Sequence, residues 1–502
     1  MSGLGPAPGR EAGGGAGTAA APGRLRQLFG HSALYAGSNL LQRGVGFLLV
    51  PLYARYFSRA EFGAMDQIVQ GTLILILLTS LGLPQGLVRG LHLETRDEEE
   101  RRRMIGALIV FLVPVALVVS AGLLLARAPL ARMVFHGEGE PAWIALGAAL
   151  YLAMSLYQLP LELLKIRLQA RRYVAWSIAT FLAIVAGNLY LIVGRGLGLA
   201  GMLIANAAAY ALIGSILWSR TIGSIRLNAE FARLAPLLAY GLPMLPSLLC
   251  RKVLDVADRY MIPWYHGLDV LGIYVMGAKV AAIVEALLLV PFLYAWQPFF
   301  YSLSDDDEAP RTFARVTQAV ALLLGLLFLS IQAAREPILE LLGRGKFAGA
   351  GGVVTLLMLA VVCNGLQYCV SAGIHLRRKL TQEMGIMAAA AGVNLVLNLI
   401  LIPTLAGTGA ALATLAAYAF YLAGSFVLAQ RCYPVPYAWG RLANVAAQTG
   451  LAFAVLTQVE APALRAAVVA VWIVTCPLLD LSRHGDLRAL RSWRRAAGPG
   501  EG

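Results

Sequence analysis

Basic side chains stand in the middle of long apolar stretches at several places in the chain. Arg43 and Arg251 each lie about halfway through such a stretch, and Lys252, Arg259 and Lys279 lie in two neighbouring ones. A charge at this depth in a membrane costs at least about 2.5–3.5 kcal/mol, so it usually faces a cavity or a partner. Arginine binds phosphate groups bidentately. The predicted substrate-binding residues, in a net positive cavity suited to an anionic head group such as pyrophosphate, are Arg43, Arg251, Lys252 and Lys279.

Acidic side chains accompany these bases. Asp66, Asp255 and Glu285 lie inside apolar stretches, where a carboxylate often belongs to an ion or proton path. We therefore treat them as candidate ion-coupling residues, for a proton or a sodium ion. Structural pairing is the alternative, because Asp255 lies four residues from both Arg251 and Arg259, the spacing at which a helix pairs opposite charges. Arg259 lies near the outer end of its stretch, where its long side chain is expected to snorkel.

Other patterns that carry chemistry are weak. The acidic run at 305–308 is expected to be a solvated loop, and the five cysteines lack the spacing of a metal site or a disulfide framework. The sequence contains no Gly-rich nucleotide loop and no nucleophile elbow. We therefore expect no catalytic residue, no metal and no cofactor, so the chain is not predicted to be an enzyme.

Composition places these residues in a membrane. The chain has 502 residues, of which 59% are hydrophobic and 14% charged, whereas soluble domains average about 45–50% and about 25%. Windows of about 20 apolar residues, enough to cross a bilayer, recur about fourteen times. The predicted spans are 32–54, 64–88, 104–126, 141–164, 173–194, 197–219, 236–262, 271–300, 313–334, 351–375, 384–403, 406–430, 442–458 and 463–481. The predicted class is an all-α integral membrane protein.

The charge of the chain indicates its topology. The formal net charge is +14, and most of the 41 Lys and Arg residues fall in alternate loops between the predicted spans. This is the positive-inside bias of membrane proteins, so it does not indicate nucleic-acid binding. It predicts a multi-pass protein of the cytoplasmic (inner) membrane, with an even number of spans and both termini in the cytoplasm.

An internal repeat divides the chain. The segment 198–210 resembles 406–418 at an offset of 208 residues, and the same offset places Arg43 on Arg251. Repeats of this kind are common in transporters, with the binding site at the repeat interface. The repeat predicts two six-helix lobes in a parallel pseudo-two-fold arrangement around a central cavity. The expected parts are a disordered cytoplasmic tail at 1–26, an N-lobe at 27–220, a C-lobe at 235–432, two further spans at 440–482 and a basic cytoplasmic tail at 483–502.

Three segments carry a family resemblance. They are residues 46–63 followed by Asp66; Tyr240-Gly-Leu-Pro243 followed by Asp258-Arg259-Tyr and Gly272-Ile-Tyr274; and 398–403 followed by 407–414. Together they resemble the polysaccharide biosynthesis (O-antigen flippase, Wzx-like) family of the multidrug/oligosaccharidyl-lipid/polysaccharide exporter superfamily. The resemblance covers roughly residues 30–430.

The resemblance implies two lobes that form a V around a central cavity, with two extra helices behind them. It implies a flippase that moves an undecaprenyl-pyrophosphate-linked oligosaccharide across the membrane by alternating access. The product would be lipopolysaccharide O-antigen, capsule or exopolysaccharide. The implied partners are the lipid-linked oligosaccharide, the bilayer and a polysaccharide polymerase complex.

Other functions stay open. A cation-coupled multidrug extruder or a peptidoglycan-precursor (lipid II) flippase has the same fold, although an extruder of hydrophobic cations favours an acidic cavity. A membrane glycosyltransferase needs catalytic carboxylates on a sizeable external loop, and every predicted loop here is short. A purely structural scaffold would leave the arginines in mid-membrane unexplained.

Overall fold

The computed structural model describes residues 48–89, 97–167, 169–303 and 306–483, and every regular element in these ranges is helical. A helical segment at 48–56 precedes the first named helix. The named helices are α2 (Arg59–Ser80), α3 (Leu83–Arg89), α4 (Glu98–Leu125), α5 (Arg127–Phe135), α6 (Pro141–Ile166), α7 (Ala170–Asn188), α8 (Gly198–Thr221), α9 (Ala235–Gly241), α10 (Leu245–Val284), α11 (Val290–Ser302), α12 (Ala309–Gly343), α13 (Ala350–Val370), α14 (Ala372–Leu376), α15 (Leu380–Cys432), α16 (Trp439–Gln458) and α17 (Pro462–Arg483).

The membrane class predicted from composition is confirmed. In the described ranges, nine helical stretches are long and apolar enough to cross a membrane, judged by length and composition. Two of them contain a pair of helices each, because the helical backbone breaks at Gly267 in α10 and at Ala406 in α15. α16 and α17 coincide with the last two predicted spans. Most of the first predicted span, Arg43 and the predicted tail at 1–26 lie outside the described residues, so the number fourteen stays a prediction.

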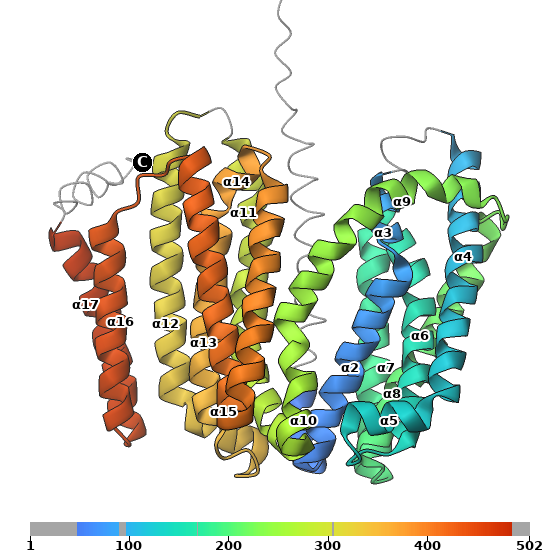
Figure 1. Cartoon of the computed structure of the whole chain (residues 1–502), viewed down its shortest axis with the longest axis horizontal. Helices are drawn as coiled ribbons and strands as arrows, with labels where there is room; N and C mark the ends of the chain where they lie inside the picture. The colour runs from blue at the N-terminus through green and yellow to red at the C-terminus, as the bar shows by residue number, and fades with distance from the viewer. Residues whose placement is uncertain (1–47, 90–96, 168, 304–305, 484–502) are drawn as a thin grey trace, which may run out of the picture.

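The helices form two groups that meet along α2 and α10 (Figure 1). We call the segment 48–56 with α2–α8 the first half, and α9–α15 the second half. α16 and α17 pack on α12 at the outer edge of the second half. Gly198 and Ala406, which the repeat aligns, both adopt a φ of 51°, so the repeat extends to a backbone feature. The exact boundaries of the two lobes stay a prediction.

Close backbone contact joins α2 to α10. A Cβ atom on Gly63 would lie 2.7 Å from the carbonyl oxygen of Leu268, and one on Gly272 would lie 2.1 Å from that of Arg59. Glycine lets backbones approach in this way in lipid, where no hydrophobic drive brings helices together. The contact places the residues that follow on α2 directly against both arms of α10.

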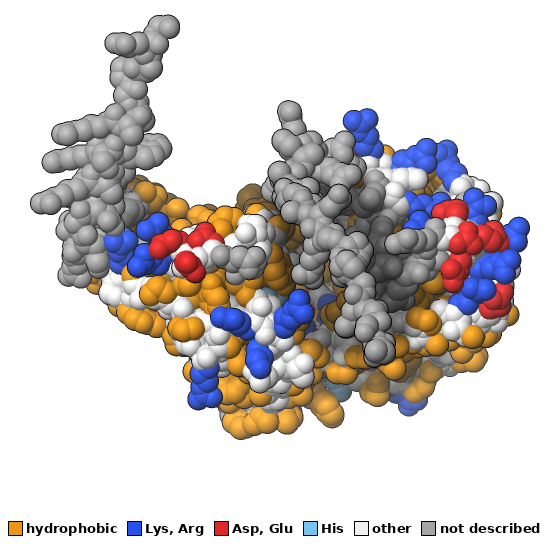
Figure 2. Space-filling view, turned by 90° about the horizontal axis from the view of Figure 1, so that it is seen from above, with side chains coloured by type: hydrophobic (Ala, Val, Ile, Leu, Met, Phe, Trp, Pro, Cys, Tyr) orange, Lys and Arg blue, Asp and Glu red, His pale blue; other side chains and the backbone are white. Residues whose placement is uncertain are grey.

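Charged side chains gather at one end of the molecule. Figure 2 shows this end, which carries α9, α11 and α14, with Lys and Arg grouped around its rim and hydrophobic side chains on the flanks. At the start of α4, Glu99 pairs with Arg103 of the same helix and with Arg226, which follows α8. The positive-inside bias predicts that this face lies in the cytoplasm.

Candidate functional site

A cavity of about 350 Å³ lies where the two halves meet. Most of its lining belongs to α2, α10, α13 and α15, so both halves contribute to it. Its charged lining residues are Asp66, Lys252, Asp255, Asp258, Arg259, Lys279 and Glu285. The side chains of Asp255 and Lys279 are 35% and 29% exposed, so the cavity is not sealed from solvent.

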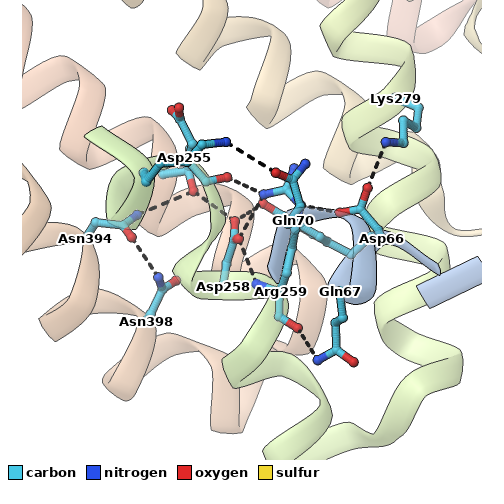
Figure 3. A network of polar contacts seen from close by, with 12 residues as sticks. Asp66, Gln67, Gln70, Asp255, Asp258, Arg259, Lys279, Asn394 and Asn398 are labelled. Carbon is cyan, nitrogen blue, oxygen red and sulfur yellow. Dashed lines mark hydrogen bonds and ion pairs between the residues drawn. The ribbon is translucent and has the colours of Figure 1, made fainter. Parts of the chain in front are cut away.

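Asp66 of α2 forms ion pairs with both arms of α10. Its side chain is 1% exposed, and its two carboxylate oxygens lie 2.7 Å from Arg259 Nε and 2.7 Å from Lys279 Nζ. Arg259 precedes the break at Gly267 and Lys279 follows it. One carboxylate of the first half therefore holds two helices of the second half (Figure 3).

Arg259 lies in the site and not at the membrane surface, where the sequence predicted its side chain. Its side chain is 14% exposed and pairs with Asp66 and with Asp258, whose Oδ1 lies 3.2 Å from Arg259 Nη1. Its backbone carbonyl accepts a hydrogen bond of 2.9 Å from Gln67. The prediction that Arg259 snorkels is wrong because α2 packs against α10 at this depth and brings the carboxylate of Asp66 to the guanidinium, beside that of Asp258 on α10 itself.

Arg251 is held within the second half. Its Nε lies 3.5 Å from Asp255 Oδ2, and its terminal nitrogens donate to Asn364 Oδ1 at 3.4 Å and to the Tyr368 hydroxyl at 3.3 Å on α13. The Tyr418 hydroxyl of α15 donates to Asp255 at 2.6 Å. The contact between Arg251 and Asp255 is therefore the structural pairing that the four-residue spacing allowed as an alternative.

Lys252 has a different environment. Its Nζ donates to Gln70 Oε1 at 3.4 Å, and no carboxylate among the described residues lies within ion-pair distance of it. Glu285 opens a π-helical turn, Glu285–Leu289, and also lines the cavity. Arg43 lies outside the described residues, so its role in substrate binding stays a prediction.

The charge balance of the cavity differs from the sequence expectation. Four carboxylates and three basic groups stand among its described lining residues, and Arg251 beside them pairs with Asp255. The expected net positive charge is therefore absent from the described lining. Two of the three bases are already paired with Asp66, which leaves Lys252 as the described lining base with no ion pair.

A polar cluster behind this network was not singled out as a site from the sequence. Asp258 accepts hydrogen bonds from the hydroxyls of Tyr274 and Thr414. Asn394 donates to Thr414 at 3.4 Å and accepts from Asn398 at 2.9 Å, as Figure 3 shows in part. The two asparagines lie four residues apart on one helix face in an apolar span, and this spacing is the signal that would have pointed to them.

These features define a class of protein. A helical membrane protein with two repeated halves and an ion-pair network at a cavity between them is built like a transporter. The family model described as polysaccharide biosynthesis protein matches residues 31–304, and the chain belongs to this family. It is 25% identical over 321 residues to the succinoglycan biosynthesis transport protein ExoT of Rhizobium meliloti (strain 1021), and the match covers 63% of each chain.

Solved structures have the same fold. The lipid II flippase MurJ in an inward closed conformation matches with a TM-score of 0.75 and 12% identity, covering 91% of this chain and 99% of that one. An outward-facing multidrug resistance transporter of the MATE family and MOP superfamily matches with a TM-score of 0.57 and 11% identity, covering 83% and 96%. At these identities the likeness shows the fold alone. The polysaccharide biosynthesis family suggested by the resemblance is confirmed by the family model.

Proposed function

We propose that this protein is a flippase for a lipid-linked oligosaccharide in the synthesis of a surface polysaccharide. The cargo is an undecaprenyl-pyrophosphate-linked repeat unit, and the membrane is the cytoplasmic (inner) one, with both termini in the cytoplasm. The observation that carries the proposal is a cavity of about 350 Å³ between the two halves, bordered by both basic and acidic side chains, in a chain of the polysaccharide biosynthesis family. The name of its relative, a succinoglycan transport protein, supports the same class of cargo.

Lys252 is the described residue best placed to meet the pyrophosphate first. It borders the cavity without a carboxylate partner among the described residues, so a phosphate does not have to displace an existing ion pair. Lys279 becomes a second ligand when phosphate replaces Asp66 as its counterion. Arg251 and Arg43 complete the proposed set, and Arg251 would keep its Asp255 contact while its Nη atoms turn from α13 to the cargo.

The same exchange supplies a coupling step. A pyrophosphate that binds Lys279 leaves Asp66 with Arg259 as its described cation, and a proton or sodium ion would then replace the lost charge. Asp255 and Glu285 also border the cavity and are the other proposed ion-coupling residues. A complex with the polymerase that receives the repeat unit is part of the proposal, because the flipped cargo needs an acceptor enzyme.

The alternatives within the fold are a multidrug extruder and a lipid II flippase. The balanced charge of the described cavity favours neither an organic cation nor a dianion by itself. The polysaccharide family and the named relative favour the oligosaccharide cargo. No feature of the described site favours one of these other cargoes over the oligosaccharide.

The test is transport into proteoliposomes that contain an undecaprenyl-pyrophosphate-linked oligosaccharide, followed by probing of the outer leaflet with an impermeant glycosidase. We expect Lys252→Ala and Arg251→Ala to lose most of the transport, and Arg251→Lys to keep part of it because the charge stays while the bidentate fork is lost. The control is Arg344→Ala, which removes a basic residue from a loop outside the cavity. Normal transport by both alanine variants in the cavity would refute the assignment.

A further inference from the structure

A lysine of the second half closes the end of a helix in the first half. Lys346, in the loop between α12 and α13, donates from Nζ to the carbonyl oxygens of Arg55 at 2.8 Å and Phe57 at 3.2 Å. A third carbonyl of the same turn lies 3.4 Å away. These oxygens end the helical segment 48–56, where the last carbonyls have no partner within the helix. A cation at a helix C-terminus also matches the negative end of the helix dipole.

A glutamate of the first half closes the start of a helix in the second half. Glu138, in the loop between α5 and α6, accepts a hydrogen bond of 2.6 Å from the backbone N–H of Leu268. Leu268 follows the break in α10, and its N–H is one of the donors that a new helix leaves unpaired. Gly267 has a φ of 79°, and a Cβ atom there would lie 2.6 Å from Glu138 Oε1. The turn is shaped to receive this carboxylate.

The two contacts are copies of each other in the repeat. Lys346 follows Glu138 by 208 residues, the offset that relates segment 198–210 to 406–418. Each residue sits in the loop between the third and fourth spans of its half, counted from the sequence, and each reaches the turn between the first and second spans of the other half. Their charges are opposite, and so are the helix ends they meet. The acid caps a helix N-terminus and the base caps a helix C-terminus, which is the favourable sign at both.

We infer that Glu138 and Lys346 are a pair of exchanged helix caps that latch the two halves together at this end of the transporter, here called the latched end. It is the end that carries α5 and the breaks in α10 and α15 (Figure 1). The loop of Lys346 is also anchored by Phe347, which is 1% exposed and packs on Phe62 of α2, with 5.2 Å between the two ring centroids. Each cap bonds backbone of the opposite half, so separating the halves at this end breaks both caps at once.

The inference deepens the proposed alternating access by naming what the cycle must release at the latched end. It does not depend on the cargo, because the latch joins protein to protein. A lost helix cap costs about 1 kcal/mol, so removing one cap should raise the ratio of open to closed molecules about fivefold. The caps have separate partners, so their effects should multiply to about 25-fold when both are removed.

The experiment measures opening directly in the full chain, reconstituted in lipid nanodiscs. Spin labels at Met133 of α5 and Leu341 of α12, which are 65% and 81% exposed, report the distance between the halves at the latched end in a background without the five native cysteines. The test variants are Glu138→Met, Lys346→Met and the two combined. We expect a longer distance to gain population in each single variant, and most in the double variant.

Matched controls lie next to each cap. Arg344→Ala and Glu140→Ala remove a charge from the same two loops, and neither side chain has a hydrogen bond or ion pair with the other half among the described residues. Both variants should leave the distance distribution unchanged. The charge reversal Lys346→Glu places an acid at the negative end of a helix, so it should open the latched end more than Lys346→Met does. Overlapping distributions for wild type and the double variant, with both proteins folded by circular dichroism, overturn the inference. A failure of oligosaccharide transport in the unmodified protein would refute the proposed cargo and leave this result unaffected.

Discussion

Replacing Asp66 with asparagine should remove the main electrostatic contact between the halves. The side chain is 1% exposed and has two cations at 2.7 Å, and breaking a buried ion pair by removing one partner costs about 3–5 kcal/mol. Arg259 keeps Asp258 at 3.2 Å, and Lys279, at 29% exposure, can turn toward solvent in the cavity. Both effects reduce the loss, so we expect about 3 kcal/mol for Asp66→Asn, the lower end of that range.

Asp255→Asn is the comparison that tests this reasoning. Its partner Arg251 lies 3.5 Å away, and the two side chains are 35% and 22% exposed, so the loss should be about 1 kcal/mol or less, as for partly exposed pairs. The assay is the midpoint of thermal unfolding in nanodiscs, followed by tryptophan fluorescence. Adding Lys279→Met to Asp66→Asn removes one stranded cation and should restore part of the loss. Two results would refute the buried contact of Asp66 with its two cations: an Asp66→Asn variant no more destabilised than Asp255→Asn, or a further loss when Lys279→Met is added.

Two further predictions concern assembly and orientation. Gly272→Ala should lower the unfolding midpoint and the yield of folded protein, because the new Cβ would lie 2.1 Å from the Arg59 carbonyl oxygen. Overpacking of this kind costs about 1–3 kcal/mol or more. The control Gly122→Ala, whose new Cβ would have nothing within 4 Å, should change neither quantity. In intact cells, an impermeant thiol reagent added outside should label a cysteine at Glu140 and spare one at Arg171, because the positive-inside bias places the second loop in the cytoplasm; the reverse pattern would invert the topology proposed here.

The sequence predicted the helices well because span length and apolarity are local properties. α6 and α8 lie within a few residues of the predicted spans 141–164 and 197–219, since a bilayer fixes how many apolar residues a helix needs. The separate helices within α10 and α15 were also predicted, with turns near Gly267 and Ala406. The local 3.6-residue periodicity contains no information about which helices touch, so the pairing of α2 with α10 was not predicted.

The site shows the same limit. Arg251 and Asp255 were recognised as a candidate pair because they lie on one helix, four residues apart. The pairs of Asp66 with Arg259 and Lys279 join residues 193 and 213 positions apart, and no spacing rule reaches that far. The charges of the individual predicted spans therefore suggested an excess of basic residues in the cavity. In the folded protein, carboxylates and basic groups from different spans come together and pair.

The two sets of contacts between the halves differ in strength, and this difference orders the steps of a transport cycle. Each cap at the latched end lies at the surface and stabilises the closed state by about 1 kcal/mol. Asp66, in contrast, is buried between two cations, and breaking its ion pairs costs about 3–5 kcal/mol. Thermal motion alone can release the caps at modest cost, but it opens the Asp66 contact far more rarely. In the proposed cycle, a phosphate bound to Lys279 would replace Asp66 as its counterion, and Arg259 would keep its ion pair with Asp258. The proposed anionic cargo would therefore lower the barrier that the empty protein retains, and full separation of α2 from α10 would depend on its head group in the cavity.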